Sequence, residues 1–428
     1  MNVLLIGSGG REHALAFKIH ESINLSRLYI LSGNPGTKSL GENIDNIDQN
    51  DYESIVNFCN DKNVELVVIG PEQPLVNGLA DFLRQNNINV FGPNKNAAEI
   101  EAHKTFAKRL MFKYNIPTAA YAEFSSDEIG KAKEHLSNLI FPCVIKADGL
   151  AAGKGVIICK EVTEANQALE EILVNKIFGQ SGEKIIIEEF LIGEEASIFA
   201  ITDGTNFICL PSAQDHKRIG DNDTGKNTGG MGAYSPAPII TKDILNEVEE
   251  KIITPTLTAM ESEGRKFSGC LYCGLMLTSE GPKVVEFNCR FGDPETQVVL
   301  PILEGNFLQL LYSSAIGKLD KSAVKYGGGS AVCVVAASNG YPDSYTKGYE
   351  IHGLNYQSDG IIVFHAGTKE TENKIVTNGG RVLGVTAVNK TNDLKAAKQS
   401  AYSALEKINF KDIYFRKDIA DKALKDKK

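Results

Sequence analysis

The first hundred residues constrain the fold most, because short apolar runs alternate there with segments of helical periodicity. Helical patterns begin at Arg11 and lie near Tyr52–Asp61 and Leu79–Gln85. The apolar runs are Val3–Ile6, Leu28–Leu31, Leu66–Ile69 and Val90–Phe91. Uniformly apolar strands separated by helices are typical of a parallel sheet that is covered on both faces. The sequence therefore predicts an open parallel α/β sheet at the N-terminus.

Three turn-rich segments follow these strands, at Gly7–Gly10, Ser32–Gly36 and Gly70–Pro74. Ligands of open parallel sheets bind outside the carboxyl ends of the strands, so we expect the three turns to line one crevice. The segment Gly7–His13 also precedes a helix, whose N–H groups can hold an anion. Glu12 stands where a dinucleotide fingerprint needs its third glycine. This favours another phosphate-bearing ligand over nicotinamide or flavin, and a purely structural turn stays open.

The middle of the chain is predicted to hold a small hairpin-based lobe. A helix from about Ala102 to Tyr114 leads into it, and strands at Pro142–Ala147 and Val156–Cys159 flank a glycine loop. A further helix is expected at Ala165–Leu173, and longer strands begin at Ile185.

Beyond this lobe, Gln214–Pro238 is rich in glycine and is expected to form a long functional loop. A helical pattern at Lys242–Gly264 contains Pro255, which predicts a kink or a break. Strands are expected at Leu271–Thr278 and Lys283–Asn288.

The C-terminal part is predicted to be a further α+β unit. Helices should reach about Ile316, and Lys318–Gly329 reads as a linker. Three strand patterns and a helix at Asp393–Ile408 follow.

Charge and cysteine use narrow the class of partner. The 428-residue chain has a formal net charge of −9 at pH 7, which argues against non-specific nucleic-acid binding and favours small metabolites. Its apolar runs are too short for a membrane helix, and no export signal is visible. The eight cysteines lack framework spacing, so we expect reduced thiols and a cytoplasmic protein. Cys270 and Cys273 should point to opposite faces of one strand.

A glycine loop with two lysines lies in Val144-Ile-Lys-Ala-Asp-Gly-Leu-Ala-Ala-Gly-Lys-Gly-Val156. Lys146 ends a strand, and Gly153 and Gly155 let the backbone approach a triphosphate closely. A Walker A loop is excluded, because glycine rather than Ser or Thr follows Lys154. The pattern instead predicts a flap that closes over phosphates. An ordinary flexible hairpin is the alternative, and it would not explain lysines at both base and tip.

An acidic hinge follows in Ile185-Ile-Ile-Glu-Glu-Phe-Leu-Ile-Gly-Glu-Glu195. A hinge backbone offers one N–H and one C=O to a flat heterocycle, and Glu195 is placed to accept hydrogen bonds from ribose hydroxyls. A solvated charge cluster remains the alternative for this segment.

The strongest chemical signal lies in Val284–Gln297. Side chains on a strand alternate, so Glu286 and Asn288 face the same side, and their oxygens suit Mg²⁺ that bridges nucleotide phosphates. Just beyond them, Arg290 can hold a carboxylate or an acyl phosphate in a forked grip, and Asp293 can take an amine. Such a concentration of charge argues against surface polar residues after an edge strand.

In this order the lysine-bearing flap, the Glu-Glu-Phe-Leu hinge and the Glu-Phe-Asn strand resemble the ATP-grasp ligases. Within that superfamily the chain is similar, over essentially its whole length, to the phosphoribosylamine–glycine ligase family. The motifs that carry this resemblance are Gly7-Ser-Gly-Gly-Arg-Glu-His13, Gln214-Asp-His-Lys-Arg218, Asn227-Thr-Gly-Gly-Met-Gly-Ala233, Arg290-Phe-Gly-Asp-Pro-Glu-Thr-Gln297, His365-Ala-Gly-Thr-Lys369 and Thr377-Asn-Gly-Gly-Arg381.

The resemblance implies a multidomain α/β and α+β fold. An N-terminal open parallel α/β (pre-ATP-grasp) domain is expected at 1–102, an ATP-grasp domain at 103–317 with a mobile flap lobe at about 120–190, and a small C-terminal α+β domain at 318–428. The resemblance further implies a carbon–nitrogen ligase that uses ATP with Mg²⁺ or Mn²⁺. Such an enzyme activates glycine as glycyl phosphate and joins it to 5-phosphoribosylamine in purine biosynthesis. A monomer or a small homo-oligomer is expected.

The resemblance also implies roles for residues that match the family's motifs. Those expected to bind ATP are Lys104, Lys146, Gly153, Lys154, Gly155, Glu188, Leu191 and Glu195. Those expected to bind the other substrates are Gly9, Gly10, Arg11, Glu72, Asn227, Gly229 and Gly230. Those expected in catalysis are Arg290, Asp293 and Asp215, and those expected to bind the metal are Glu286 and Asn288.

Three histidines accompany these motifs. His13 and His216 are expected to be hydrogen-bonded structural groups rather than bases. His103 stands before Lys104, where the family pattern has smaller residues, and it puts the presentation of Lys104 in doubt.

Two other functions remain open from the sequence. A carboxylase or an amino-acid ligase of the same superfamily would share the fold, and the Arg290–Gln297 signature argues against both. A nucleotide-binding regulator without turnover would be favoured by loss of Lys146, Glu286, Asn288 or Arg290, and all four are present.

Overall fold

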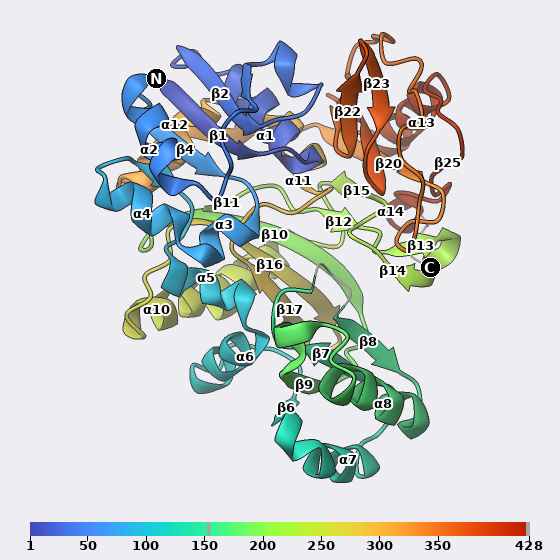
Figure 1. Ribbon diagram of the computed structural model, residues 1–428. Helices are drawn as coiled ribbons and strands as arrows, with labels where there is room; N and C mark the ends of the chain where they lie inside the picture. Colours follow the sequence, from blue (N-terminus) through green and yellow to red (C-terminus); the bar gives the residue numbers. More distant parts are fainter. Residues whose placement is uncertain (152–154, 425–428) are drawn as a thin grey trace.

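In the computed structural model, which describes residues 1–151 and 155–424, the chain begins with the predicted parallel sheet (Figure 1). Its strands are β1 Asn2–Gly7, β2 Arg27–Ser32, β3 Glu42–Ile44, β4 Leu66–Ile69 and β5 Val90–Phe91, in the spatial order β3-β2-β1-β4-β5. All neighbouring strands run parallel. The surrounding helices are α1 Gly10–His20, α2 Tyr52–Asp61, α3 Glu72–Asn77 and α4 Leu79–Gln85.

Residues of β1 alternate between two hydrophobic cores, which explains the uniformly apolar run. Leu4 and Ile6 enter one core, whereas Val3 and Leu5 enter the other. The short strand β3 was not predicted, because only its last residue is buried and no apolar run marks it.

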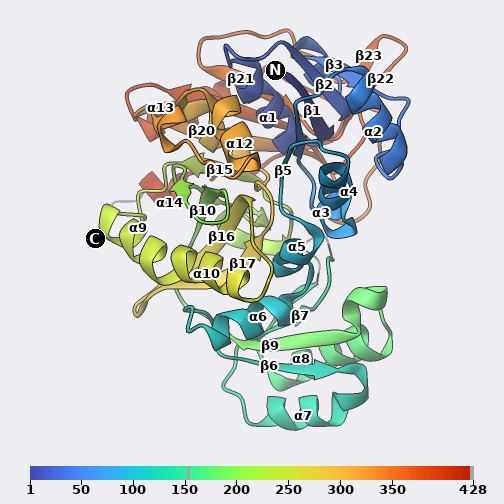
Figure 2. The same ribbon diagram turned by 90° about the vertical axis from the view of Figure 1, so that its left-hand side faces the viewer.

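The predicted hairpin lobe projects from the rest of the molecule (Figure 2). Its strands are β6 Tyr121–Ser125, β7 Cys143–Ala147, β8 Val156–Cys159 and β9 Lys184–Glu189, in the antiparallel order β6-β9-β7-β8. Its helices are α7 Ile129–Ser137 and α8 Val162–Leu169, and a π-helical turn continues α8 to Val174. Cys143, Ile145 and Ala147 pack into the lobe's own core, so the alternate residues Val144 and Lys146 face the opposite side.

A four-stranded antiparallel sheet forms the centre of the molecule. Its strands are β10 Glu194–Thr202, β11 Phe207–Cys209, β16 Gly269–Thr278 and β17 Gly281–Asn288, in the order β11-β10-β16-β17. The associated helices are α5 Lys95–Ala102, α6 Lys104–Lys113, α9 Lys242–Val248 and α10 Thr254–Ser262. The irregularity predicted near Pro255 is a π-helical turn at Glu249–Ile253 between α9 and α10. Pro255 then lies in the first turn of α10, where its missing N–H costs least.

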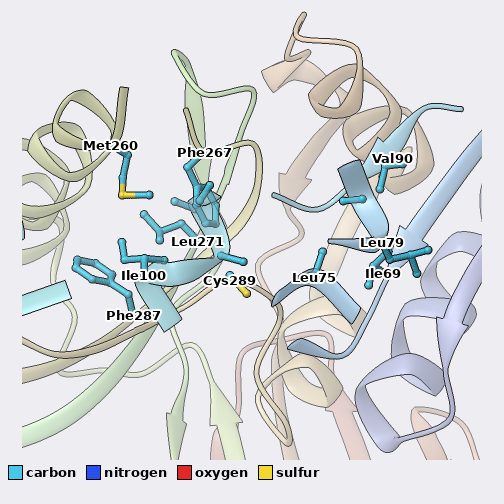
Figure 3. Close-up of a cluster of buried hydrophobic side chains, with 14 of the residues drawn as sticks. Ile69, Leu75, Leu79, Val90, Ile100, Met260, Phe267, Leu271, Phe287 and Cys289 are labelled. Carbon is cyan, nitrogen blue, oxygen red and sulfur yellow. The ribbon is translucent and has the colours of Figure 1, made fainter. Parts of the chain in front are cut away.

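One hydrophobic core joins the N-terminal unit to the central sheet (Figure 3). Leu75 and Leu79 of the N-terminal unit belong to the same buried cluster as Leu271 and Phe287 of the central strands. Cys273 also lies in this cluster, whereas Cys270 lies in the core on the other side of β16. The two cysteines therefore point to opposite faces, as predicted, and all eight cysteines are free.

The C-terminal unit is built on a six-stranded sheet. Its strands are β12 Gln214–Asp215, β15 Gly232–Ser235, β20 Ser330–Ser338, β24 Arg381–Asn389 and β21 Ile361–His365 in that order, and β25 Ile413–Tyr414 pairs with β20. Helix α13 Leu394–Leu405 packs on this sheet, and Figure 1 places the sheet beside the N-terminal unit. Further elements are α11 Thr296–Val299, α12 Phe307–Ala315 and α14 Asp421–Leu424. The strands β18 Leu303–Gly305 and β19 Val324–Tyr326 pair with each other, and β22 Thr368–Thr371 forms a hairpin with β23 Lys374–Thr377.

Two segments that were predicted to be irregular contain strands, so these predictions are wrong. The expected loop Gln214–Pro238 contains β12, β15 and the hairpin of β13 Arg218–Gly220 with β14 Thr224–Asn227. The expected linker Lys318–Gly329 contains β19, which pairs with β18. Their strands are only two to four residues long, and they pair with partners far away or across tight turns, so they leave no periodic pattern in the sequence.

Within the described residues, no helix combines the length and the apolar character needed to cross a bilayer.

Candidate active site

A cleft of about 1720 Å³ is lined by all three units and by the flap lobe. It brings together most of the residues that the sequence singled out. These are Gly9, Gly10, Arg11, Glu72, Lys104, Lys146, Gly155, Glu188, Leu191, Glu195, Asp215, Asn227, Gly229, Glu286, Asn288, Arg290 and Asp293. The predicted convergence of the strand exits is confirmed, because Ser8–Arg11, Ser32–Pro35 and Glu72 share this cleft.

Three predicted residues stand apart from that set. Gly153 and Lys154 lie outside the described residues. Gly230 is not among the residues that line the cleft. It has φ 108°, and a Cβ there would lie 2.4 Å from Cδ of Pro294, so this position needs glycine for the turn and for close packing.

Two predicted lysines form one wall of the cleft. Lys104 is the first residue of α6, and its Nζ donates to the carbonyl of Gly149 at 3.0 Å. Lys146 lies near the end of β7, and its Nζ donates to the carbonyl of Val285 at 3.1 Å. Burial lowers the pKa of Lys104, and nearby Glu286 opposes that shift. Both ammonium groups therefore stand at the base of the flap, where anionic oxygens would meet them.

Glu188 pairs with Lys146 and with a second lysine, Lys108, for which no role was predicted, and all three line the cleft. The carboxylate of Glu188 lies 2.8 Å from Nζ of Lys146 and 3.1 Å from Nζ of Lys108. Lys108 also donates to Thr118 Oγ1 at 2.7 Å, and burial lowers its pKa to about 8. The i, i+4 spacing from Lys104 could have identified Lys108. Glu188, expected at adenine and ribose, is thus occupied by two lysines.

The hinge after β9, which was predicted to contact a flat heterocycle, lies at the cleft. Leu191 and Glu195 line the cleft on either side of the turn into β10. The carboxylate of Glu195 lies 2.8 Å from Nζ of Lys217. Lys217 belongs to the Gln214–Arg218 motif, but no role was predicted for it.

Glu286 and Asn288 are the two oxygen donors expected at the metal, and both line the cleft from β17. Phe287 between them enters the core, which confirms that the two side chains share a face. Burial alone would raise the pKa of Glu286, but Lys217 and the lysines of the cleft wall lower it, so the carboxylate is ionised. Within 1–151 and 155–424 no three His, Cys, Asp or Glu residues form a metal-binding group. Two protein donors suit a cation that takes its other ligands from phosphates and water.

Arg290 is clamped by two carboxylates. Its guanidinium lies 2.9 Å from Glu101 and 3.1 Å from Glu72, and Glu72 also lies 3.4 Å from Arg11. Burial would raise the pKa of Glu72, but Arg290 and Arg11 lower it to about 2. Glu101 was not predicted, because a glutamate in a helix carries no sequence mark of burial; it accepts the N–H of Cys289 at 2.7 Å. This network fixes Arg290 at the cleft.

Asp293 lies in the cleft close to the N-terminal glycine loop. Its carboxylate accepts a hydrogen bond from Gln297 at 2.9 Å and lies 3.3 Å from Arg381. Burial would raise its pKa, but Arg381 and Arg11 lower it. A Cβ on Gly10 would lie 2.6 Å from Nε2 of Gln297, so glycine is required for this approach. Arg381 belongs to a motif that carried the family resemblance, but no role was predicted for it.

Glu12 explains why the first loop departs from a dinucleotide site. Its carboxylate accepts the N–H of Gly9 at 2.7 Å and lies 2.7 Å from Nε of Arg11. A carboxylate therefore caps the N–H group that a dinucleotide phosphate would use, and it orients Arg11 toward the cleft.

Asp215 is buried at the centre of the site. Burial raises its pKa to about 8 although Lys217 opposes the shift, and Glu295 and Glu195 raise it further. Nearby, the hydroxyl of Tyr272 donates to Glu295 at 2.9 Å. A cationic amine next to Asp215 would favour its ionised form, which is the arrangement expected for an amine substrate.

The histidines have structural partners. Nδ1 of His13 accepts the N–H of His365 at 2.9 Å, and Nε2 of His216 accepts the N–H of Ala420 at 3.1 Å. Burial lowers both pKa values to about 3, and neither ring lines the cleft. His103 precedes α6 and lies 3.0 Å from Asp148, so it ties the start of α6 to the base of the flap.

A hairpin lobe whose lysines face a central strand carrying a glutamate and an asparagine defines this chain as an ATP-grasp enzyme. The profile of the phosphoribosylglycinamide synthetase ATP-grasp (A) domain matches residues 102–296. The N and C domain profiles of the same enzyme match residues 1–101 and 331–422. The chain belongs to the phosphoribosylamine–glycine ligase family, also called phosphoribosylglycinamide synthetase.

Individual relatives agree with this assignment. The phosphoribosylamine–glycine ligase of Caldanaerobacter subterraneus is 46% identical over 98% of this chain and 99% of its own length. The crystal structure of phosphoribosylamine–glycine ligase from Thermotoga maritima has a TM-score of 0.85 and 36% identity, and covers 98% of this chain and 100% of that one. A biotin carboxylase domain from Hydrogenobacter thermophilus, solved with MgADP and bicarbonate, has a TM-score of 0.73 at 16% identity and covers 97% and 91% of the two chains. The last likeness concerns the fold alone.

Proposed function

We propose that this chain joins glycine to 5-phosphoribosylamine with ATP and releases glycinamide ribonucleotide, ADP and phosphate, a step of purine biosynthesis. The observation that carries the proposal is the shared cleft, in which Lys104, Lys146, Glu286 and Arg290 face one volume with Asp293. These groups come from the start of α6, the flap lobe, the Glu-Phe-Asn strand and the Arg290–Gln297 signature. Their convergence supports one reaction centre rather than separate binding sites.

Chemistry requires the carboxylate of glycine to be activated, because a carboxylate is a poor acyl donor. One carboxylate oxygen attacks the γ-phosphorus of ATP and ADP leaves, which forms glycyl phosphate. The amine of phosphoribosylamine then attacks the acyl carbon, and phosphate leaves with the acyl C–O bond broken. The amine loses one proton overall. No nucleophilic side chain is needed, so positioning and charge neutralisation supply the catalysis.

The ATP phosphates would lie against Lys104, Lys146 and Gly155 at the base of the flap. Leu191 and Glu195 would hold adenine and ribose, and Glu188 would keep Lys146 in place through its ion pair. A bound Mg²⁺ or Mn²⁺ would neutralise phosphate charge, and Glu286 and Asn288 are the residues that would hold it. Lys154 and Gly153 complete the proposed ATP set.

The amine substrates would lie toward the end of the cleft near the N-terminal glycine loop. Asp215 and Asp293 would receive the two amino groups, and Arg290 would face the acyl phosphate. The residues proposed for the ribose phosphate and hydroxyls are Gly9, Gly10, Arg11, Glu72, Asn227 and Gly229, and Gly230 would hold the turn beside them. The domain limits 1–102, 103–317 and 318–428, the cytoplasmic location and a monomeric or small oligomeric state also stay predictions.

Measurement of ADP release tests the function. The purified chain is supplied with MgATP, glycine and freshly generated phosphoribosylamine, and each is omitted in turn. We expect ADP release only with all three, and glycinamide ribonucleotide in equal amount. Turnover that does not depend on glycine would refute the assignment.

A further inference from the structure

The C-terminal segment Tyr414–Lys422 packs against the hairpin β13–β14, and Figure 1 shows α14 beside both strands. We call residues 414–422 the C-terminal clasp and residues 218–227 the cleft hairpin. The two segments are about two hundred residues apart in the sequence. Neither the expected loop at 214–238 nor the family motifs gave any sign of this contact.

Arg416 is the centre of the clasp, and its side chain is fully buried. Its Nη1 donates to the carbonyl of Arg218 at 2.9 Å and to Asp223 at 3.0 Å. Nε and Nη2 donate to the two oxygens of Asp418 at 2.8 and 2.7 Å. One planar guanidinium thus binds the first strand and the turn of the hairpin at once, a geometry that a lysine cannot reproduce.

Three further hydrogen bonds join the clasp to the cleft hairpin. The N–H of Asn222 donates to Asp418 at 2.8 Å, and the N–H of Lys417 donates to Asp221 at 2.8 Å. The hydroxyl of Tyr414 donates to the carbonyl of Ile219 at 2.8 Å. The whole turn of the hairpin is therefore bonded to the clasp.

The hairpin needs such support. Its strands pair at only two positions with a register shift between them, and an isolated two-stranded hairpin is marginally stable at best. Asn222 and Asp223 at its turn both have φ 55°, a left-handed conformation that is uncommon outside glycine. Contacts from outside must hold this turn, and the clasp supplies them.

The hairpin is continuous with the active site on both sides. Asp215 and Lys217 precede it, Asn227 and Gly229 end or follow it, and all four line the cleft. The carbonyl of Gly229 accepts from Arg381, which also donates to the carbonyl of Asp293 at 2.7 Å. A displaced hairpin would therefore disturb Gly229 and its contacts with Arg381 and, through it, Asp293, at the end of the cleft proposed for phosphoribosylamine.

We propose that Arg416 is a positioning residue, which through the clasp holds the cleft hairpin in the form that binds phosphoribosylamine. The proposal rests on the proposed function. Arg416 is buried behind the hairpin and does not line the cleft, so it acts through Asp223 and the backbone of Arg218.

Kinetics of Arg416→Lys, Asp223→Asn and the double variant test the proposal. Asn tolerates the left-handed backbone at 223 while it removes the charge. We expect the KM for phosphoribosylamine to rise about tenfold or more in each single variant, since small misplacements near a site have effects of this size. The KM for ATP should rise less than the KM for phosphoribosylamine, and the double variant should be no worse than the more affected single variant. Lys131→Gln, which removes an exposed pair within the flap lobe, is the control and should match wild type.

Amide hydrogen exchange is a second measurement, and it does not depend on enzyme turnover. Amides of 218–227 should exchange faster in Arg416→Lys and in Asp223→Asn, while those of β16 stay unchanged. Asp223 itself lines the cleft, so if Arg416→Lys does not fold, hydrogen exchange of the hairpin in Asp223→Asn decides the question. Unchanged exchange in the hairpin, or KM values that rise equally for all three substrates, would overturn the proposal. Absence of glycine-dependent turnover together with faster hairpin exchange would refute the proposed function and leave the clasp standing.

Discussion

Glu286 is the residue on which the proposed chemistry depends most directly. Its carboxylate is ionised and shares a strand face with Asn288. Glu286→Gln keeps the size of the side chain and removes the charge that a divalent cation needs, so we expect kcat to fall about a hundredfold or more at saturating MgATP. Steady-state ADP release measures this.

The matched control for that experiment is Glu280→Gln, an exposed glutamate at the turn that precedes the same strand. It should keep wild-type kcat and melting temperature. Wild-type velocity in Glu286→Gln at saturating magnesium would contradict the proposed metal site.

The raised pKa of Asp215 predicts that the stability of the chain without ligands depends on pH. Its pKa rises from 3.8 to about 8 on folding, so the folded chain keeps a proton that the unfolded chain has lost. Stability should therefore decline as pH rises between these values. Asp215→Asn removes this contribution, and its melting temperature should decline less than that of wild type between about pH 5 and pH 8. Scanning fluorimetry without nucleotide measures the difference, and Asp359→Asn at an exposed aspartate should behave as wild type.

At the scale of elements, the flap and the cleft hairpin should respond differently to nucleotide. From the sequence alone, 149–155 was predicted to close over phosphates and Gln214–Pro238 to form a long functional loop. The structure shows 218–227 already paired and held by the clasp. We therefore expect MgATP to protect 149–155 from limited proteolysis, because a closing flap excludes water and protease.

Residues 218–227 should resist cleavage with and without MgATP. Mass spectrometry of the first cleavage products distinguishes the two segments. Equal cleavage of 149–155 in both conditions would contradict a flap that closes over ATP.

Strands that form apolar runs were predictable, whereas short strands without an apolar run were not. The strands β1, β2, β4 and β7 are apolar runs whose burial follows from local pattern. The cleft hairpin has exposed or half-buried strands, and its stability comes from Arg416, about two hundred residues away. No local pattern can encode a partner at that distance.

At the scale of the whole molecule, Glu72 ties the N-terminal unit to the central sheet. Arg290 and Arg11 lower its pKa from 4.5 to about 2, so its contribution to stability is present above pH 4.5 and is lost as pH falls toward 2. Glu72→Gln should lower the melting temperature at pH 7 by roughly 1 °C for each kcal/mol lost, because a chain of this length has a large entropy of unfolding. The gap between variant and wild type should close as pH falls from 4.5 toward 2.

Glu134→Gln, at an exposed glutamate of α7, is the control for that comparison. Thermal melts at several pH values measure the effect. A gap that persists unchanged at low pH would contradict the ion-pair account of this contact.

The sequence by itself determined the parallel N-terminal sheet, the hairpin lobe and the identity of most cleft residues, because apolar periodicity and motif order are local properties of the chain. Tertiary structure alone decided which groups hold the site residues in place. Three buried charges have this role, and their partners are distant in the sequence. Lys108 pairs with Glu188, Glu101 with Arg290, and Arg416 with the cleft hairpin. A charged residue is ordinarily exposed, and only the folded chain shows which partner offsets the cost of burying it.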